Sequence, residues 1–343
     1  MSWQNVSRVL CVRLDSLGDV LMCTPAIRAL KKTFGCHTTL LTSGSGAAVA
    51  PYVPEIDEAL VFSAPWMKAK GPRSDAELIA QLAARRFDAA VIFTTYSQSA
   101  LPAAYLCYLA GIPLRLAHCR ENPYDLLTDW VPDPEPGATV RHEVARQLDL
   151  VGAVGAQALD PRLSFVVPHA AEVKVAALVK GMARPLVVVH PGATAASRRY
   201  PPEHYARAVD LLIDETGCDA VFTGDAGEER LVQAVKDGME NRTHSLVGQL
   251  GLAELGALIA QADVLISNNT GPAHIAAALG TPVVDLYALT NPQHTPWRVA
   301  SRVLFHDVPC RNCYKSVCPA GHHDCLRRVP PESVTAAARE LLA

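Results

Sequence analysis

The sequence predicts an α/β protein made of two parallel β-sheets, each covered by helices on both faces. Short apolar runs of the kind that form buried strands alternate along the chain with longer segments that have helical apolar spacing. A proline-rich stretch and a connector near the middle separate two such series. The 343 residues are enough for two domains with separate hydrophobic cores.

The first domain is expected over residues 1–160. Its expected elements, in chain order, are a strand at 8–14, a helix at about 20–34, strands at 37–43 and 58–63, a helix near 74–86, a strand at 88–93, and helices near 99–109 and 141–151. The segment DWVPDPEPGATV (129–140) is rich in proline and acidic residues, so it predicts a surface loop.

The second domain is expected over residues 161–343. Its expected strands are 185–191, 218–224, 263–268 and 281–287, with a short segment at 245–248, and its expected helices are 201–215, 226–238, 252–260, 272–279 and 331–342. In open sheets of this kind, ligands bind outside the carboxyl ends of the strands. The loops that follow the strands are therefore the places to look for function.

Composition excludes several classes of protein. Half of the residues are hydrophobic, 19% are charged, and the formal net charge is −3, which gives no basic surface for nucleic acid. No apolar run reaches the length of a membrane span, and the start MSWQNVSRVL does not have the pattern of a signal peptide. We expect a soluble, cytoplasmic protein, and a peripheral contact with a membrane surface stays compatible with this sequence.

Three loops after strands of the second domain contain more small polar residues than a connection needs: HPGATAASRRYPPEHY (190–205), TGDAGEER (223–230) and NNTGPAH (268–274). Each leads into a helix, and the free N–H groups and positive dipole end of a helix favour an anion. Arg198 and Arg199 are suited to a phosphate, although a solvated surface pair is the alternative. These loops predict a site for a sugar linked to a diphosphate.

The third of these loops begins a helix. Thr270 is expected to cap the helix, Gly271 to let a ligand approach the backbone, and Pro272 to fit the first turn. Asn269 and His274 could supply hydrogen bonds to a ligand. The alternative is a well-capped helix and nothing more.

Other nucleotide-binding patterns are weak or missing. The sequence contains neither GxxxxGK[ST] nor a close Asp-x-Asp pair, which disfavours a P-loop and a Mg²⁺-held diphosphate. The stretch TSGSGAAV (42–49) lacks the third glycine of a dinucleotide fingerprint, so we interpret it as a turn. Helix ends and arginine would then have to carry the charge of a leaving diphosphate.

One acid stands out in the first domain. Asp19 follows Gly18 where the first strand–loop passes into the first helix, at the carboxyl end of a strand. An ionised carboxylate there could take a proton from an incoming hydroxyl as a general base. Asp15, earlier in the same loop, competes for this role, and an acid that merely begins a helix is the alternative.

The motifs RLDSLGDVLMCTPAI, HPGATAASRRYP, TGDAGEERL and SNNTGPAHIAAALGTPVVDLY, together with the final cysteine-rich stretch, resemble glycosyltransferase family 9. This family comprises the ADP-heptose heptosyltransferases of lipopolysaccharide core assembly. The resemblance follows the chain in order over nearly its whole length. It implies a GT-B fold, in which two Rossmann-like domains face each other across a cleft and the last helix packs back on the first domain.

The resemblance also implies an activity, the inverting, metal-independent transfer of a sugar from a nucleotide to an acceptor hydroxyl, with heptose from ADP-heptose as the leading donor. The acceptor it implies is a lipid A–core precursor, another glycan, a protein or a small molecule. A sugar-nucleotide 2-epimerase of related fold, which needs no acceptor, and a non-catalytic binder of nucleotide sugars are the alternatives.

Carried over by position, Asp19 is the family's base and Arg198 stands at the lysine that meets the donor phosphate. Asn269 replaces an aspartate that holds hydroxyls of the donor sugar, which leaves the donor sugar open because an amide has a donor and an acceptor in place of charge. The donor-binding positions that the resemblance implies are Gly18, Thr194, Arg198, Thr223, Gly224, Glu228 or Glu229 for the ribose, Leu250 for the base, Asn269, Thr270, Gly271 and His274.

A cluster of cysteines near the C-terminus has the spacing of a metal site. Cys310, Cys313, Cys318 and Cys325 could hold a structural Zn²⁺ or iron that fastens a loop. Free thiols and disulfides are the alternatives. The transfer itself is expected to need no cofactor.

Overall fold

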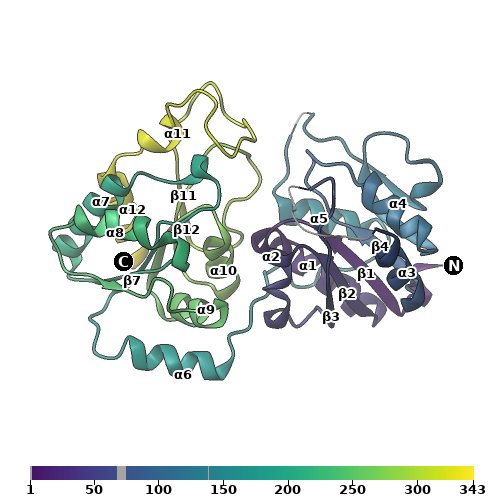
Figure 1. Ribbon diagram of the computed structural model, residues 1–343, viewed down its shortest axis with the longest axis horizontal. Helices are drawn as coiled ribbons and strands as arrows, with labels where there is room; N and C mark the ends of the chain where they lie inside the picture. The colour runs from purple at the N-terminus through teal and green to yellow at the C-terminus, as the bar shows by residue number, and fades with distance from the viewer. Residues whose placement is uncertain (1, 68–74, 138) are drawn as a thin grey trace. The chain divides into compact units, whose positions relative to one another are not determined.

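The computed structural model describes residues 2–67, 75–137 and 139–343, and the chain divides into two units, Met1–Val166 and Val167–Ala343. Within the described residues, each unit contains a six-stranded sheet in which all paired strands are parallel. Figure 1 shows the sheet of each unit with helices on both faces. The sequence placed the domain boundary at residue 160, a few residues before the division in the structure.

The first unit follows the order of the predicted elements. Its strands are β1 (Arg8–Arg13), β2 (His37–Thr42), β3 (Glu58–Val61), β4 (Ala89–Ile92), β5 (Leu114–Cys119) and β6 (Asp129–Pro132). Its helices are α1 (Leu17–Phe34), α2 (Gly44–Ala47), α3 (Asp75–Arg85), α4 (Leu101–Leu109) and α5 (Glu143–Gly152), with short 3₁₀ helices η1 (Trp3–Asn5), η2 (Ala50–Tyr52) and η3 (Tyr124–Leu126). The sheet order is β3-β2-β1-β4-β5-β6.

The second unit repeats this plan. Its strands are β7 (Leu186–His190), β8 (Asp219–Phe222), β9 (His244–Ser245), β10 (Val264–Asn268), β11 (Val283–Leu286) and β12 (Ser301–Leu304). Its helices are α6 (His169–Leu178), α7 (Pro202–Thr216), α8 (Glu229–Asp237), α9 (Leu252–Gln261), α10 (Gly271–Leu279), α11 (Asp324–Arg327) and α12 (Pro331–Leu342), with η4 (Ala196–Arg198) and η5 (Ala226–Glu228). The sheet order is β12-β11-β10-β7-β8-β9.

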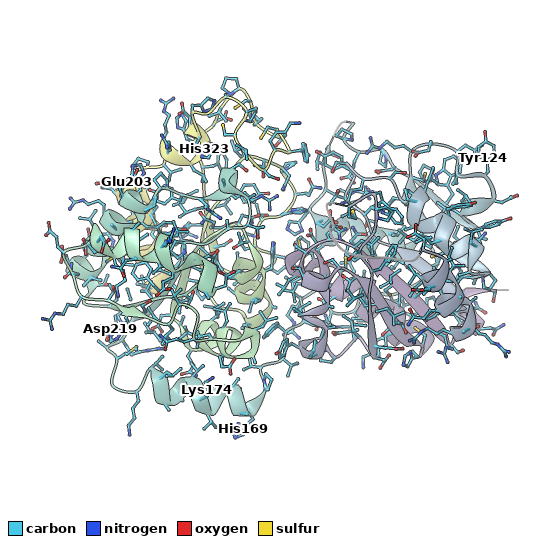
Figure 2. The ribbon with its side chains drawn as sticks, in the orientation of Figure 1. Tyr124, His169, Lys174, Glu203, Asp219 and His323 are labelled. Atoms are coloured by element: carbon cyan, nitrogen blue, oxygen red, sulfur yellow. The ribbon has the colours of Figure 1, made fainter. Side chains whose placement is uncertain are left out.

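The core of each unit is built around strands that are buried along their whole length. Every residue of β4 and of β7 is buried, as expected for parallel strands that are covered on both faces. In the second unit, α7, α8 and α12 contribute side chains to one core, while α9 packs against α10 (Figure 1). α6 lies against α9, where Lys174 (labelled in Figure 2) pairs with Glu254 at 3.1 Å.

The sequence missed several elements, among them the edge strands β6 and β12. β6 begins inside the segment that was expected to be a loop, and its Pro132 is tolerated because β6 is an edge strand. β5 and α6 were also not predicted. α2 occupies part of the expected turn at 42–49, and the first residue of the helix expected near 74–86 lies outside the described residues.

The last helix belongs to the core of the second unit. α12 contacts α7 and the strands β10, β11 and β12, and its Val334, Ala337 and Ala338 are buried there. The packing of this helix on the first domain stays a prediction. In the described ranges, no helix combines the length and the apolar character needed to cross a bilayer.

Each sheet has one point, called the switch point below, at which the direction of strand addition reverses. In the first unit it lies between β1 and β4, and in the second between β7 and β10. Ligands of open parallel sheets bind in the crevice outside the carboxyl ends of the strands at this point. The topology thus selects the loops after β1, β4, β7 and β10 as the candidate site of each unit.

Candidate functional site

A buried guanidinium organises the switch point of the first unit. Arg13, the last residue of β1, is completely buried, and its nitrogens lie 3.0 Å from Asp15 Oδ2, 3.1 Å from Asp19 Oδ1 and 2.7 Å from Glu143 Oε1. The three acids come from the loop after β1, the first turn of α1 and the first turn of α5. One cation therefore joins three separate segments at the place where a ligand is expected.

Asp19 is held in one position by the start of α1. Its Oδ2 accepts hydrogen bonds from the backbone N–H of Ser16 at 3.0 Å and from the Ser16 hydroxyl at 2.6 Å, which forms a capping box. Oδ1 faces the Arg13 guanidinium, and the side chain keeps 17% of its surface exposed. The buried Gly18 precedes it in the first turn of α1.

Asp15 lines a pocket at the same switch point. Its Oδ1 accepts a hydrogen bond of 2.7 Å from Gln98, in the loop after β4. The pocket has a volume of about 280 Å³ and is lined by the polar Asp15 and Gln98 and by the apolar Leu14, Trp66 and Phe93, among others. Burial raises the pKa of Asp15 to about 6, although the Arg13 guanidinium opposes this shift.

Helix α5, predicted over about 141–151, supports the end of β1 and the loop after β4 through buried polar side chains that were not predicted. Gln147 donates to Glu143 Oε1 at 2.7 Å and to the Thr94 carbonyl at 3.0 Å, and Arg146 donates to the same carbonyl. These polar side chains are buried. Two sequence signals could have identified them. The helix start HEVARQ has too few apolar residues to cover a sheet, and the apolar strand β1 ends in an arginine, Arg13.

In the second unit, the loops after β7, β8 and β10 begin side by side, because these strands are neighbours in the sheet. His190, which ends β7, has its Nδ1 3.0 Å from the hydroxyl of the buried Thr223 after β8. Burial lowers the pKa of His190 to about 4, so the ring is neutral at pH 7. This contact joins two of the predicted loops.

Glu228 lies over two glycines of these loops. A Cβ added to Gly192 would overlap its carboxylate, and one added to Gly224 would lie 3.0 Å from Oε2. The same carboxylate accepts a 3.0 Å hydrogen bond from the Asp225 N–H, and burial raises its pKa. Glu229, the other predicted acid, is exposed at the start of α8.

The paired arginines have different surroundings. Arg199 donates from Nε to the Ala193 carbonyl at 2.7 Å, so it braces its own loop. Arg198 is half-buried, and in the described part of the chain no acceptor is bonded to its guanidinium. Thr194 is exposed in the same loop. Arg198 is therefore the cation that remains available to an anion.

The two asparagines after β10 have separate functions. Asn268 is buried and fixes the loop after β7, because it accepts from the Tyr200 N–H at 3.0 Å and donates to the Pro191 carbonyl at 2.7 Å. Asn269 donates from Nδ2 to Asp285 Oδ2 at 3.0 Å and to the His294 carbonyl at 2.7 Å. The sequence singled out Asn269 but not its partner Asp285.

The start of α10 corrects one prediction. Thr270 occupies the cap position but makes no side-chain capping bond, since its hydroxyl donates to the Asn268 carbonyl at 3.2 Å. Pro272 lies in the first turn, as predicted, behind Gly271. His274 is buried in α10, and Leu250 is half-buried between β9 and α9. Their roles in ligand binding stay predictions.

Asp285 is an uncommon buried acid. It lies on β11 opposite Ser267 and is completely buried. Burial raises its pKa from the usual 3.8 to about 8, against the opposing effect of the hydrogen bond from Asn269. The carboxyl is therefore protonated at neutral pH.

The predicted metal site is not supported. Among the described residues, no group of three or more His, Cys, Asp or Glu side chains is placed to hold a metal ion, and all ten cysteines are free thiols. Cys310 Sγ lies 3.7 Å from His322 Nε2, while the loop that contains His323 (labelled in Figure 2) directs backbone N–H groups at Cys318.

Comparisons with known proteins agree on one family. A family model described as glycosyltransferase family 9 (heptosyltransferase) matches residues 76–323. Lipopolysaccharide heptosyltransferase 2 of Escherichia coli (strain K12) is 27% identical over 346 residues, covering 95% of this chain and 96% of that protein. Lipooligosaccharide heptosyltransferase 2 of Haemophilus influenzae is 31% identical over 166 residues, or 47% of this chain and 48% of that protein, so this chain spans about half the length of that relative.

Solved structures show the same fold. The crystal structure of a family 9 glycosyltransferase from Veillonella parvula superimposes with a TM-score of 0.82 at 23% identity, covering 100% of this chain and 98% of that one. Together with the two parallel six-stranded sheets of the described residues, this confirms the predicted α/β fold of GT-B type with two Rossmann-like units.

Removing Glu143 tests the importance of the Arg13 cluster. We expect Glu143→Ala to lower the free energy of unfolding by about 3–5 kcal/mol, because it leaves part of a buried guanidinium unpaired. Glu340→Ala, which breaks the exposed pair with Arg302, is the control and should change it by no more than about 1 kcal/mol. Denaturant unfolding measures both, and equal small effects would contradict the importance of the cluster.

The buried carboxyl of Asp285 should make stability depend on pH. Between pH 4 and 8 the folded state keeps a proton that the unfolded state has lost, so this group makes the free energy of unfolding fall as the pH rises. Asp285→Asn lacks this proton, and its stability relative to the natural protein should therefore increase steadily from pH 4 to pH 8. Denaturant unfolding across this range measures the difference, and a constant difference would show that Asp285 titrates normally.

Proposed function

The chain belongs to glycosyltransferase family 9, and on this premise we propose that it is an inverting, metal-independent glycosyltransferase that moves a sugar from a nucleotide to an acceptor hydroxyl. The observation that supports this most strongly is the arrangement of the second unit. The loops that match the family's motifs begin at the carboxyl ends of the adjacent strands β10, β7 and β8. That edge is where a parallel sheet binds a nucleotide.

We assign the general base to Asp19. The acceptor O–H transfers its proton to the Asp19 carboxylate while the oxygen attacks the anomeric carbon, and the bond from that carbon to the diphosphate oxygen breaks. The bonds to Ser16 and Arg13 fix the carboxylate in one orientation. Attack opposite the leaving group inverts the anomeric configuration.

The leaving diphosphate carries away the electrons of the broken bond. Arg198, whose guanidinium has no acceptor in the described part of the chain, is proposed to bind this diphosphate together with Thr194 and the backbone amides near Thr270 and Gly271. The N-terminal end of α10 adds its positive dipole end. This set of donors can stabilise the developing charge without a metal ion.

The nucleoside is proposed to lie beside Glu228. Its carboxylate, above Gly192 and Gly224, is positioned to accept hydrogen bonds from ribose hydroxyls, and Leu250 to pack on the base. ADP-heptose is the donor that the family resemblance implies, and the named relatives are heptosyltransferases. We propose a heptose from ADP-heptose and a lipopolysaccharide core precursor as acceptor.

The pocket of the first unit suits a sugar acceptor. Trp66 and Leu14 offer an apolar surface for the face of a pyranose ring, while Asp15 and Gln98 can bind hydroxyls. We propose that the acceptor sugar binds in this 280 Å³ pocket.

Replacing the base should separate binding from turnover. Asp19→Asn is expected to bind ADP with an affinity close to that of the natural protein but to release ADP from ADP-heptose about 10²–10⁴ times more slowly in the presence of acceptor. Asp15→Asn is the matched variant on the same guanidinium and should keep more of the turnover. Steady-state kinetics with a crude acceptor pool, and calorimetry for ADP, measure the two effects.

The outcomes distinguish the alternatives. A larger loss in Asp15→Asn than in Asp19→Asn would assign the base to Asp15. Conversion of the donor without an acceptor would indicate a 2-epimerase, and binding without ADP release from any acceptor would indicate a non-catalytic binder.

A methyl group at Gly192 should displace the Glu228 carboxylate. We expect Gly192→Ala to weaken ADP binding about tenfold with little loss of stability, because the flexible end of Glu228 can move whereas the backbone stays in place. Gly152→Ala, whose added Cβ meets no atom within 4 Å, is the control. Unchanged ADP affinity in calorimetry would remove Glu228 from the nucleotide site.

A further inference from the structure

The Asn269 side chain is fixed in one orientation by two hydrogen-bond acceptors. Both hydrogens of its Nδ2 have acceptors, Asp285 Oδ2 at 3.0 Å and the His294 carbonyl at 2.7 Å. A backbone carbonyl can only accept, so a flipped amide would set two acceptor oxygens against each other. The amide nitrogen must therefore face inward, and the carbonyl oxygen Oδ1 must face the other way.

The outward atom is an acceptor that the protein does not use. In the described residues no donor is bonded to Asn269 Oδ1, although the residue as a whole is only 5% exposed. It lies directly after β10, beside the switch point between β7 and β10 and two residues before the start of α10. Because no protein group in the described residues donates to Oδ1, this oxygen is open to a hydrogen bond from a ligand.

The pair carries no charge. Asp285 is completely buried, its Oδ1 has no hydrogen-bond partner in the described part of the chain, and burial raises its pKa to about 8. An ionised carboxylate at this position would repel a diphosphate bound nearby, whereas a protonated carboxyl behind an amide does not. Asn269 thus offers the hydrogen-bond acceptor of a carboxylate without its negative charge.

We propose that Asp285 is a positioning residue that holds the Asn269 amide so that Oδ1 accepts a hydrogen bond from one hydroxyl of the nucleotide-linked sugar. The inference rests on the proposed function for the identity of the ligand. It adds the polarity of the contact: the position recognises a neutral hydrogen-bond donor on the sugar next to the diphosphate, and it does not recognise the nucleotide. Its effect is therefore confined to the part of the affinity that the sugar contributes.

The test compares the affinities for ADP and ADP-heptose by calorimetry. Asn269→Ala and Asp285→Leu should each reduce the gain in affinity from ADP to ADP-heptose by about five- to tenfold, the value of one hydrogen bond, with ADP itself bound as before. Asp285→Asn should stay within about twofold of the natural protein, because its amide oxygen can still accept from Asn269. Asp210→Asn, which alters a buried carboxylate bonded to the backbone N–H groups of Glu240 and Asn241, is the control for general destabilisation.

A second measurement does not depend on a ligand. In the protein labelled with ¹⁵N-asparagine, the two side-chain amide protons of Asn269, assigned by Asn269→Ala, should exchange slowly with solvent in the natural protein and in Asp285→Asn. In Asp285→Leu one of them should exchange at least tenfold faster. Equal exchange rates in all three would overturn the positioning role of Asp285.

The calorimetric outcomes separate this inference from the proposed function. If the natural protein binds ADP-heptose more tightly than ADP and Asp285→Leu does so to the same extent, the inference is wrong and the proposed function stands. If Asp285→Leu loses ADP affinity equally, the residue is merely structural and the inference is again wrong. If the natural protein binds neither compound, the proposed function fails and the assignment of a sugar hydroxyl fails with it.

Discussion

The buried ionic cluster around Arg13 is the interaction on which the first unit depends. A guanidinium that is taken out of water loses its hydration, and this cost is recovered only where carboxylates meet it in good geometry. Arg13 meets Asp15, Asp19 and Glu143, which belong to a loop and to the first turns of two helices. The three acids outnumber the one guanidinium, and their environments differ. Burial raises the pKa of Asp15, while the capping box of α1 holds the Asp19 side chain in place.

The second unit uses the same strand order, and the loop after β10 is held by neutral side chains. Asn268 connects β10 to the loop after β7 through backbone partners, and Asn269 is fixed by Asp285, a carboxyl that keeps its proton. His190 is neutral for the same reason of burial. A neutral acid and amide near the start of α10 suit the proposed diphosphate, because a fixed negative charge there would oppose it and Arg198 is left to attract it.

The fold was largely predictable, and the missed elements lack a continuous apolar pattern. The central strands β1, β4, β7 and β10 were found, whereas the interior strand β5 was missed because Arg115 and His118 interrupt its apolar run. β6 and β12 lie at the edges and are half-exposed, so their sequences lack the continuous apolar run of a buried parallel strand. α6 has apolar residues spread around the helix and only a narrow buried side, which gave no clear helical pattern. The cysteine spacing predicted a metal site, but spacing does not determine where the sulfur atoms point.

The two-sheet α/β class, the family, and the polar loops after particular strands follow from the sequence alone, because apolar periodicity and short motifs are local properties of the chain. Which of these residues meet depends on the folded arrangement. Arg13 lies 130 positions from Glu143, and Asn269 lies 16 positions from Asp285. Both pairs are buried only when the sheets and helices pack over them. This burial strengthens the pairing of Arg13 with Glu143 and raises the pKa of Asp285, and no local sequence pattern predicts it.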